Sequence, residues 1–294
     1  MLAFPFCIWC FVFANYVFDP WAVKMADEST AGVRSVQFAI DVLEAVAFSD
    51  EEIGVTQIAD RLGLTKGSVH RHLHTLVERG YLAQNPATSR YTIGPKSRLL
   101  ARIAPETDLV QIAEGPMRAL RDQLGQTAVL SEMTPRGALV IAKLSGTSPI
   151  EIGVRSGSEL TFHASAQGKI MLAYAPHPFQ RRVLARPLAV FTEKTVTSVA
   201  RLEKELVEAA KLGYASAPEE AMLGINAVAA PIFDSHDACV ASLAIVGSIQ
   251  FLPAKPKSSD LEALIEASQQ ISRKLGHGTH QEGVAASRRR GGAR

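Results

Sequence analysis

Residues 56–82 read TQIADRLGLTKGSVHRHLHTLVERGYL, and this stretch decides the fold of the first part of the chain. Thr56 is placed to cap one short helix, and Thr65 is placed to cap a second helix that Gly80 ends. Gly63 gives the tight turn between them. The apolar positions that recur at helical spacing are Ile58, Ala59 and Leu62 in the first helix and Val69, Leu73 and Leu76 in the second. Two short helices joined by a glycine turn predict a helix-turn-helix.

The flanking residues extend this unit on both sides. An earlier helix is predicted because apolar residues recur at helical spacing, and we expect Val36, Ile40, Leu43 and Val46 or Ala47 to face inward. Residues 81–83 and 90–93 are strand-like, and residues 85–89 (NPATS) between them are typical of a turn. A helix-turn-helix followed by a small hairpin predicts a winged helix.

The outward face of the second helix carries side chains that suit DNA. Lysine, arginine, histidine and serine donate to phosphates and base edges, and an arginine can hold a guanine with two hydrogen bonds. Residues 61–98 contain seven lysines or arginines and one acid, Glu78, whereas the whole chain has a net charge of only +2. The positive charge is therefore concentrated where phosphate binding requires it. The predicted DNA-binding residues are Thr65, Lys66, Gly67, Ser68, His70, Arg71, His74 and, in the wing, Arg90.

The composition is that of a folded protein. Of the 294 residues, 47% are hydrophobic and 20% are charged, which excludes a disordered chain. Three cysteines, two of them close together near the N-terminus, do not make a disulfide framework, and a cytoplasmic protein is expected.

The two ends of the chain differ from the rest. Residues 1–23 are strongly apolar, but no positive charge precedes Lys24, and prolines and polar residues interrupt the run. We expect that translation begins at Met25, with a membrane anchor at residues 2–23 as the alternative. Residues 277–294 are rich in glycine, alanine and arginine, so a disordered basic tail is expected. The expected organisation is an extension at 1–32, a DNA-binding domain at 33–97, a linker helix at 98–112, a second domain at 113–276 and the tail.

The second domain mixes helical and strand-like runs, which predicts an α+β fold. Helices are expected at 114–124 and 168–174 and from Thr197 to Gly213, the last with Leu202 and Leu206 facing inward. The expected strands are residues 128–131, 138–142, 150–154, 227–233 and 239–246.

These stretches resemble the IclR family of transcriptional regulators over residues 33–276. In the first domain the resemblance lies in residues 34–36, 39–43, 58–64, 66–71, 76–82 and 90–94. In the second it lies in residues 162–169 (FHASAQGK), 212–214, 219–220, 224 and 229–232. The resemblance implies a winged helix-turn-helix, a linker helix and an effector-binding domain with a curved antiparallel sheet similar to the GAF fold. It also implies dimers or dimers of dimers that act on operator DNA, more often as repressors.

The resemblance further implies a pocket for a small organic acid. The residues placed at it are Val154, Phe162, His163, Ala166, Gln167, Gly168, Glu219, Ala227, Ala244 and Val246. A helix start after small residues offers free amides to a carboxylate. For His163 a satisfied core histidine is expected over a ligand role, whereas residues 219–220 are equally expected as a solvated loop.

This chain departs from the family pattern at two places. Ala217 and Pro218 stand where an acid is frequent, and residues 243–247 (LAIVG) lack the hydroxyls common in the last strand. A more apolar or aromatic effector is therefore expected than a two- or three-carbon keto acid.

An enzyme is the other class considered. No nucleophile elbow, phosphate-binding loop or dinucleotide fingerprint is present, and adjacent Glu219 and Glu220 would point apart in a strand. The pair His70 and His74, like Cys7 and Cys10, lacks further ligands for a metal. The sequence therefore predicts neither a catalytic residue, nor a metal, nor a cofactor.

Overall fold

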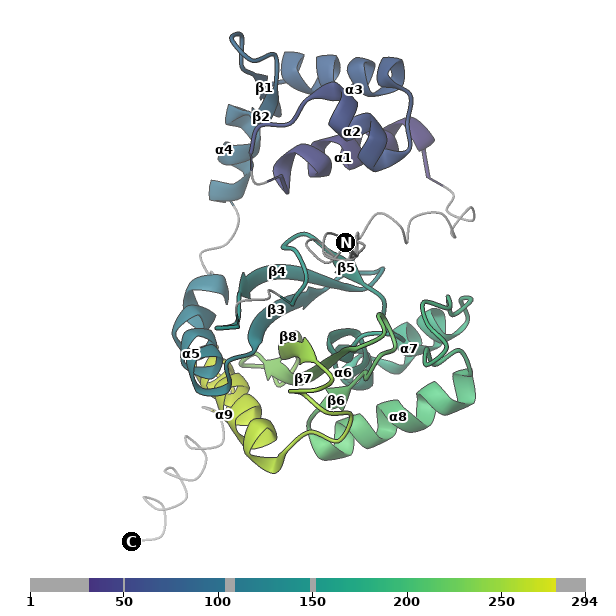
Figure 1. Cartoon of the computed structure of the whole chain (residues 1–294), viewed down its shortest axis with the longest axis vertical. Helices are drawn as coiled ribbons and strands as arrows, with labels where there is room; N and C mark the ends of the chain where they lie inside the picture. The colour runs from purple at the N-terminus through teal and green to yellow at the C-terminus, as the bar shows by residue number, and fades with distance from the viewer. Residues whose placement is uncertain (1–31, 50, 104–108, 149–151, 279–294) are drawn as a thin grey trace, which may run out of the picture. The chain divides into compact units, whose positions relative to one another are not determined.

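The computed structural model describes residues 32–49, 51–103, 109–148 and 152–278. They form two compact units with the boundary between Gly115 and Pro116. Each unit has its own hydrophobic core. The fold is α+β (Figure 1).

The first unit is a three-helix bundle with a two-stranded hairpin and a final helix. Its elements are α1 (Arg34–Ala47), α2 (Val55–Leu62), α3 (Lys66–Glu78), β1 (Leu82–Gln84), β2 (Tyr91–Ile93) and α4 (Pro95–Ile103). The core joins Val42 of α1, Ile58 of α2, Leu73 of α3 and Leu82 and Tyr91 of the hairpin. The helix-turn-helix and wing expected from the sequence are confirmed.

The inward face expected for α1 is partly wrong. Val36 is 53% exposed and Ile40 is 48% exposed, whereas Val42, Ala45 and Val46 are buried. Positions 42, 45 and 46 share one side of a helix, and positions 36 and 40 share another. Apolar residues therefore occupy two sides of α1, and only one of them is covered within the described part of this unit.

The second unit contains a six-stranded antiparallel sheet with the order β5-β4-β3-β8-β7-β6. The strands are β3 (Thr127–Met133), β4 (Ala138–Leu144), β5 (Glu159–Leu160), β6 (Ala215–Ser216), β7 (Ile225–Phe233) and β8 (Cys239–Ser248). The helices are α5 (Leu109–Leu124), which crosses the unit boundary, α6 (Ala166–Tyr174), α7 (His177–Leu184), α8 (Val199–Leu212) and α9 (Ser258–Lys274).

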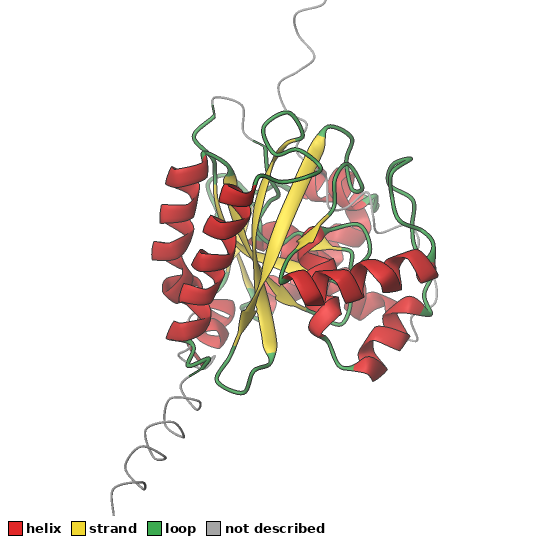
Figure 2. Cartoon of the chain, turned by 90° about the horizontal axis from the view of Figure 1, so that it is seen from below, coloured by secondary structure: helices red, strands yellow, loops and turns green. Residues whose placement is uncertain are grey.

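Helices cover both faces of this sheet. Figure 2 shows the strands between a pair of long helices on one side, which Figure 1 identifies as α5 and α9, and the shorter helices on the other. Helix α9 packs on β7 and β8, while α6 packs on the opposite face and α8 packs on α6. The side chains alternate accordingly, and in β8 Ala244 and Val246 belong to the core cluster on the α6 side.

Several expected elements need correction. Helix α5 begins at Leu109, five residues before the expected start, and Pro105 of the expected linker helix lies outside the described residues. The described part of the strand expected at 150–154, Ile152 to Val154, belongs to no strand. All three of these residues line a cavity instead.

None of the described helices is both long and apolar enough to cross a membrane. Residues 1–31, where an anchor was considered, and tail residues 279–294 lie outside the described part of the chain.

Candidate functional site

The start of α3 is set by its capping residue and by a glycine turn. Gly63 adopts the left-handed conformation (φ 63°) that ends α2. Thr65 is the N-cap of α3, and its hydroxyl oxygen accepts a hydrogen bond from the Ser68 amide at 3.3 Å. A side chain built on Gly67 would meet no atom within 4 Å, so the helix start is open to a partner.

Seven of the eight predicted DNA-binding residues are exposed on this unit. Ser68 is half-buried, and the others are exposed: Thr65, Lys66, Gly67, His70, Arg71, His74 and Arg90. Val69 and Leu73 point to the core from the opposite side of α3. The amphipathic pattern therefore leaves the cationic and histidine side chains free to reach DNA.

Not all of the nearby arginine side chains are free of contacts within the protein. Arg61 donates to the Ala45 carbonyl and the Ser49 hydroxyl, and Arg98 donates to the Ile93 carbonyl. Arg90 donates to the Glu52 carbonyl at 3.0 Å, and the Glu52 carboxylate accepts hydrogen bonds from the wing. Glu52 thus positions the wing and Arg90 together.

A cavity of about 100 Å³ lies in the second unit, between the sheet, the start of α6 and the segment before β7. Its wall combines one face of β7 and β8 with residues from three loops. The lining residues are Ile152, Gly153, Val154, Leu160, Ala164, Ser165, Gln167, Ala217, Ala221, Met222, Ile225, Ala227 and Val246. No charged side chain stands among these described lining residues.

Four of the ten predicted effector residues line this cavity: Val154, Gln167, Ala227 and Val246. Ala166 and Ala244 are buried in the adjoining core instead. Gly168 sits where a Cβ would come within 2.5 Å of the Thr161 carbonyl oxygen, so it serves close packing at the start of α6.

The remaining three predicted residues, Phe162, His163 and Glu219, contact other partners, and Glu219 is described below with Glu220. Phe162 packs edge-on against Phe179 of α7, with 5.6 Å between the ring centroids. His163 is 5% exposed, its Nε2 lies 2.8 Å from the Ala189 carbonyl oxygen, and its ring stacks on Phe191. These contacts support the interpretation of His163 as a core histidine whose hydrogen bonding is satisfied within the protein.

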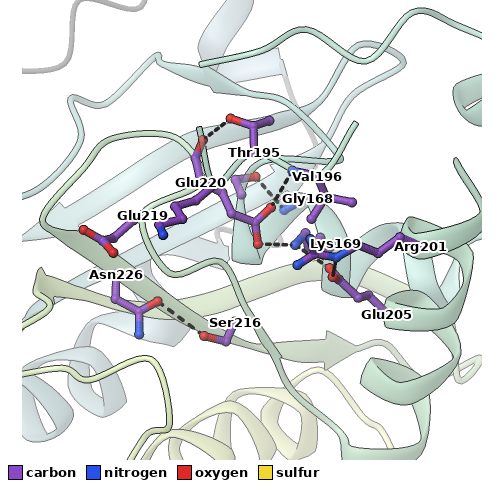
Figure 3. Close-up of polar contacts among 12 residues, drawn as sticks. Gly168, Lys169, Thr195, Val196, Arg201, Glu205, Ser216, Glu219, Glu220 and Asn226 are labelled. Atoms are coloured by element: carbon purple, nitrogen blue, oxygen red, sulfur yellow. Dashed lines mark hydrogen bonds and ion pairs between the residues drawn. The ribbon is translucent and has the colours of Figure 1, made fainter. Parts of the chain in front are cut away.

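Residues 219 and 220 do not form a solvated loop. Glu219 has a left-handed backbone (φ 59°), and its Oε1 accepts a hydrogen bond from the Gly224 amide at 2.9 Å. Glu220 is 4% exposed, and its Oε1 lies 2.5 Å from Nζ of Lys169 (Figure 3). Both carboxylates fix the loop that carries Ala221 and Met222 into the cavity wall.

Lys169 holds a buried ion pair one turn into α6. Its ammonium group contacts Glu220 and, at 2.7 Å, Oε2 of Glu205 on α8, which also pairs with Arg201 (Figure 3). Burial raises the pKa of Glu220, and the charge of Lys169 opposes that rise. Helix α6, helix α8 and the cavity loop are therefore tied together by one charged cluster, which the sequence reasoning did not identify.

Nine lining residues were missed. Ala164 and Ser165 lie inside the motif at 162–169, Gly153 precedes Val154, and Leu160 lies two residues before Phe162, so whole motifs taken with their neighbours include them. Ala217, Ala221 and Met222 carry no comparable signal, because small apolar residues in a loop resemble any other turn.

Comparisons with known proteins give the family. The IclR helix-turn-helix domain matches residues 35–86, and the bacterial transcriptional regulator IclR C-terminal domain matches residues 101–273, more than half of the chain. The chain belongs to the IclR family of transcriptional regulators.

Curated relatives of this IclR-family protein are regulators and not enzymes. The HTH-type transcriptional regulator BhcR of Paracoccus denitrificans is 31% identical over 247 residues, which covers 83% of this chain and 88% of that protein. The transcriptional repressor IclR of Escherichia coli is 28% identical over 225 residues, which covers 75% of this chain and 82% of that protein.

Solved structures share the architecture. Thermotoga maritima IclR has a TM-score of 0.62 at 25% identity and covers 83% of this chain and 99% of its own. An IclR homologue from Microbacterium hydrocarbonoxydans, complexed with 4-hydroxybenzoate, has a TM-score of 0.68 at 24% identity and covers 82% of this chain and 98% of its own. At that identity the second likeness shows the fold alone.

Proposed function

We propose that this IclR-family regulator is a repressor whose α3 and wing bind operator DNA, and whose cavity binds a ring-sized organic acid that controls this binding. The observation that carries the DNA-binding part is the exposed face of α3. Lys66 and Arg71 are exposed there, while the same helix buries Val69 and Leu73. Cationic side chains on the second helix of a helix-turn-helix are placed to meet the major groove.

A homodimer is part of the proposal. The first unit leaves apolar side chains uncovered on α1 and α4, and a two-fold protein suits a palindromic operator. These side chains are Val36, Ile40, Leu99, Leu100 and Ile103. A second copy that covered them would remove this apolar surface from water.

The cavity supports an effector with an apolar body. Most of its described wall consists of alanine, valine, leucine, isoleucine and methionine. Strand β8 contributes Val246, which belongs to the stretch 243–247 that lacks the hydroxyls common in the family. The Gly168 amide is used by the Ser165 cap, but the two amides before it in α6 lack intrahelical acceptors, so the helix start can receive a carboxylate. The 4-hydroxybenzoate complex of the Microbacterium protein adds that this fold can hold a ring acid.

Operator binding is tested by gel mobility shift with the full chain and DNA from upstream of its own gene. We expect a retarded band that resists nonspecific competitor and is lost in Arg71→Ala, because one bidentate base contact contributes about 1–3 kcal/mol. Lys204→Ala is the matched control, since Lys204 is exposed on α8 in the other unit. A specific band that Arg71→Ala leaves unchanged would contradict the role given to α3. If the upstream DNA gives no band, selection from random DNA decides whether the chain has an operator.

The effector class is tested by isothermal titration with benzoates, glyoxylate and pyruvate. The apolar wall predicts that the benzoates bind more tightly. Tight binding of glyoxylate or pyruvate alone would exclude the ring-sized effector.

A further inference from the structure

Gln167 has an unusual position at the effector cavity. It is the second residue of α6, it lines the cavity, and it is only 1% exposed. Its Oε1 is buried and has no hydrogen-bond partner among the described residues. Leaving a buried amide oxygen unpaired is unfavourable by about 1–3 kcal/mol, so such a group in a cavity wall calls for a ligand.

The other polar side chain of the described wall is already satisfied. The Ser165 hydroxyl donates to the Thr161 carbonyl at 2.6 Å and accepts from the Gly168 amide at 3.0 Å. The remaining lining residues are apolar or glycine. Within the described wall, Gln167 therefore supplies the one side-chain hydrogen-bonding group that is still free.

The nearest cation on α6 is not free to bind an anion. Lys169 Nζ is held between Glu220 at 2.5 Å and Glu205 at 2.7 Å, and neither it nor its partners line the cavity. A second charged group on the ligand would thus be buried without a counter-ion, which is strongly unfavourable. The described wall therefore favours a polar and neutral group beside Gln167.

We infer that Gln167 is a specificity-determining residue that binds a neutral hydroxyl on the ring of the effector. This inference rests on the proposed ring-acid effector. The carboxamide can turn about its terminal torsion, which is broad for glutamine, and so present either its oxygen or its nitrogen to the cavity. A hydroxyl both donates and accepts, so it pairs with the amide in either orientation.

The size of the cavity fits a single ring. An engineered apolar cavity of about 150 Å³ holds benzene. The cavity here is smaller, about 100 Å³, so it has room for no more than one ring, and the amide in its wall matches a ring with one hydroxyl in polarity.

The experiment compares hydroxybenzoates with methylbenzoates of the same shape. The full chain is titrated by calorimetry with the 2-, 3- and 4-hydroxybenzoates and with the 2-, 3- and 4-methylbenzoates. We expect one hydroxybenzoate to bind about 10- to 100-fold more tightly than its methyl twin, since the methyl group leaves the amide unpaired.

Gln167→Met assigns that preference to the side chain. Methionine has similar length but no amide, so the variant should lose the preference for the hydroxyl while still binding the methyl twin. Gln123→Met, the same substitution at an exposed position on α5, should keep the wild-type preference. The affinities of each hydroxybenzoate and its methyl counterpart are also compared on the wild-type chain. The inference can therefore be tested even if Gln167→Met folds poorly.

Three results would overturn the inference. Equal binding of every hydroxyl and methyl pair to the wild type, or a preference that survives in Gln167→Met, would remove the role of Gln167 and leave the ring-acid effector intact. No binding of any benzoate would instead remove the proposed effector class, and this inference with it, without bearing on operator binding.

Discussion

The buried polar residues near the cavity show how single side chains settle their hydrogen bonds. Lys169 and Glu220 neutralise one another, and Ser165 is used twice by the backbone around it. His163 has a single polar contact, at Ala189, and a ring partner in Phe191. Of the side chains in this region, His163 is the one whose protonation conflicts with its surroundings.

Stability should fall in mild acid because of His163. Burial lowers the pKa of this histidine below its ordinary value of 6.5, and the charge of Lys169 lowers it further, against the opposing effect of the Ala189 carbonyl. Below pH 6.5 the unfolded chain therefore binds a proton that the folded chain resists, so the free energy of unfolding decreases as the pH falls. His163→Gln removes the titrating group and should flatten this part of the profile.

Urea unfolding of the wild type and His163→Gln between pH 5 and pH 8 measures the difference. The two free energies of unfolding should converge as the pH falls from about 7 toward 5. A constant offset between the two proteins across this range would show that His163 does not titrate differently on folding.

At the scale of elements, one ion pair joins α6 to the loop before β7. Lys169→Met leaves Glu220 buried without its partner, and breaking a buried pair in this way costs about 3–5 kcal/mol. Without the lysine, burial and the charge of Glu205 raise the pKa of Glu220 against only the hydrogen bond from the Val196 amide, so the folded variant binds a proton more readily than the unfolded chain. The variant should therefore regain stability as the pH falls toward 4.5, the ordinary pKa of glutamate.

The double variant Lys169→Met with Glu220→Gln provides the comparison. It has no unpaired charge at position 220, so it should be more stable than Lys169→Met alone at pH 7. Lys204→Met on the exposed side of α8 controls for loss of a lysine. If the double variant were less stable than Lys169→Met, the loss would arise from packing and not from the isolated carboxylate.

Sequence periodicity predicted helices α2 and α3 well because their buried faces are purely apolar. Helices α2 and α3 bury Ile58, Ala59, Val69 and Leu73, and the 3.6-residue pattern is clear. Helix α9 was not predicted, because its buried positions include Ser268 and Ser272, which weaken its apolar stripe.

The cavity was predicted only in part for a different reason. Gln167 lies in a motif that the family shares, and Ala227 lies two residues before another, so the resemblance reached them. Ala217, Ala221 and Met222 reach the wall because an ion pair and a left-handed residue hold their loop there. Such long-range contacts join positions 51 residues apart and leave no periodic trace in the sequence.

At the scale of the whole molecule, the two proposed sites lie in different compact units, with α3 before residue 115 and the cavity after residue 116. Control of the operator by the effector then requires a coupling free energy between the units, and such coupling is reciprocal. If the effector weakens operator binding by a factor within the usual range of about 5- to 150-fold, the operator must weaken effector binding by the same factor.

Two measurements test this reciprocity. Calorimetry gives the Kd of the best-binding benzoate with and without saturating operator DNA. The Kd of the operator is then measured with and without the same benzoate, and the two ratios are compared. A repressor released by its effector predicts that each partner raises the Kd of the other by an equal factor. Gln167→Met should need more hydroxybenzoate to release the operator while its effector-free operator affinity stays unchanged, because Gln167 lies in the effector unit alone. An effector Kd that the operator leaves unchanged would mean that the cavity, whatever it binds, does not control α3.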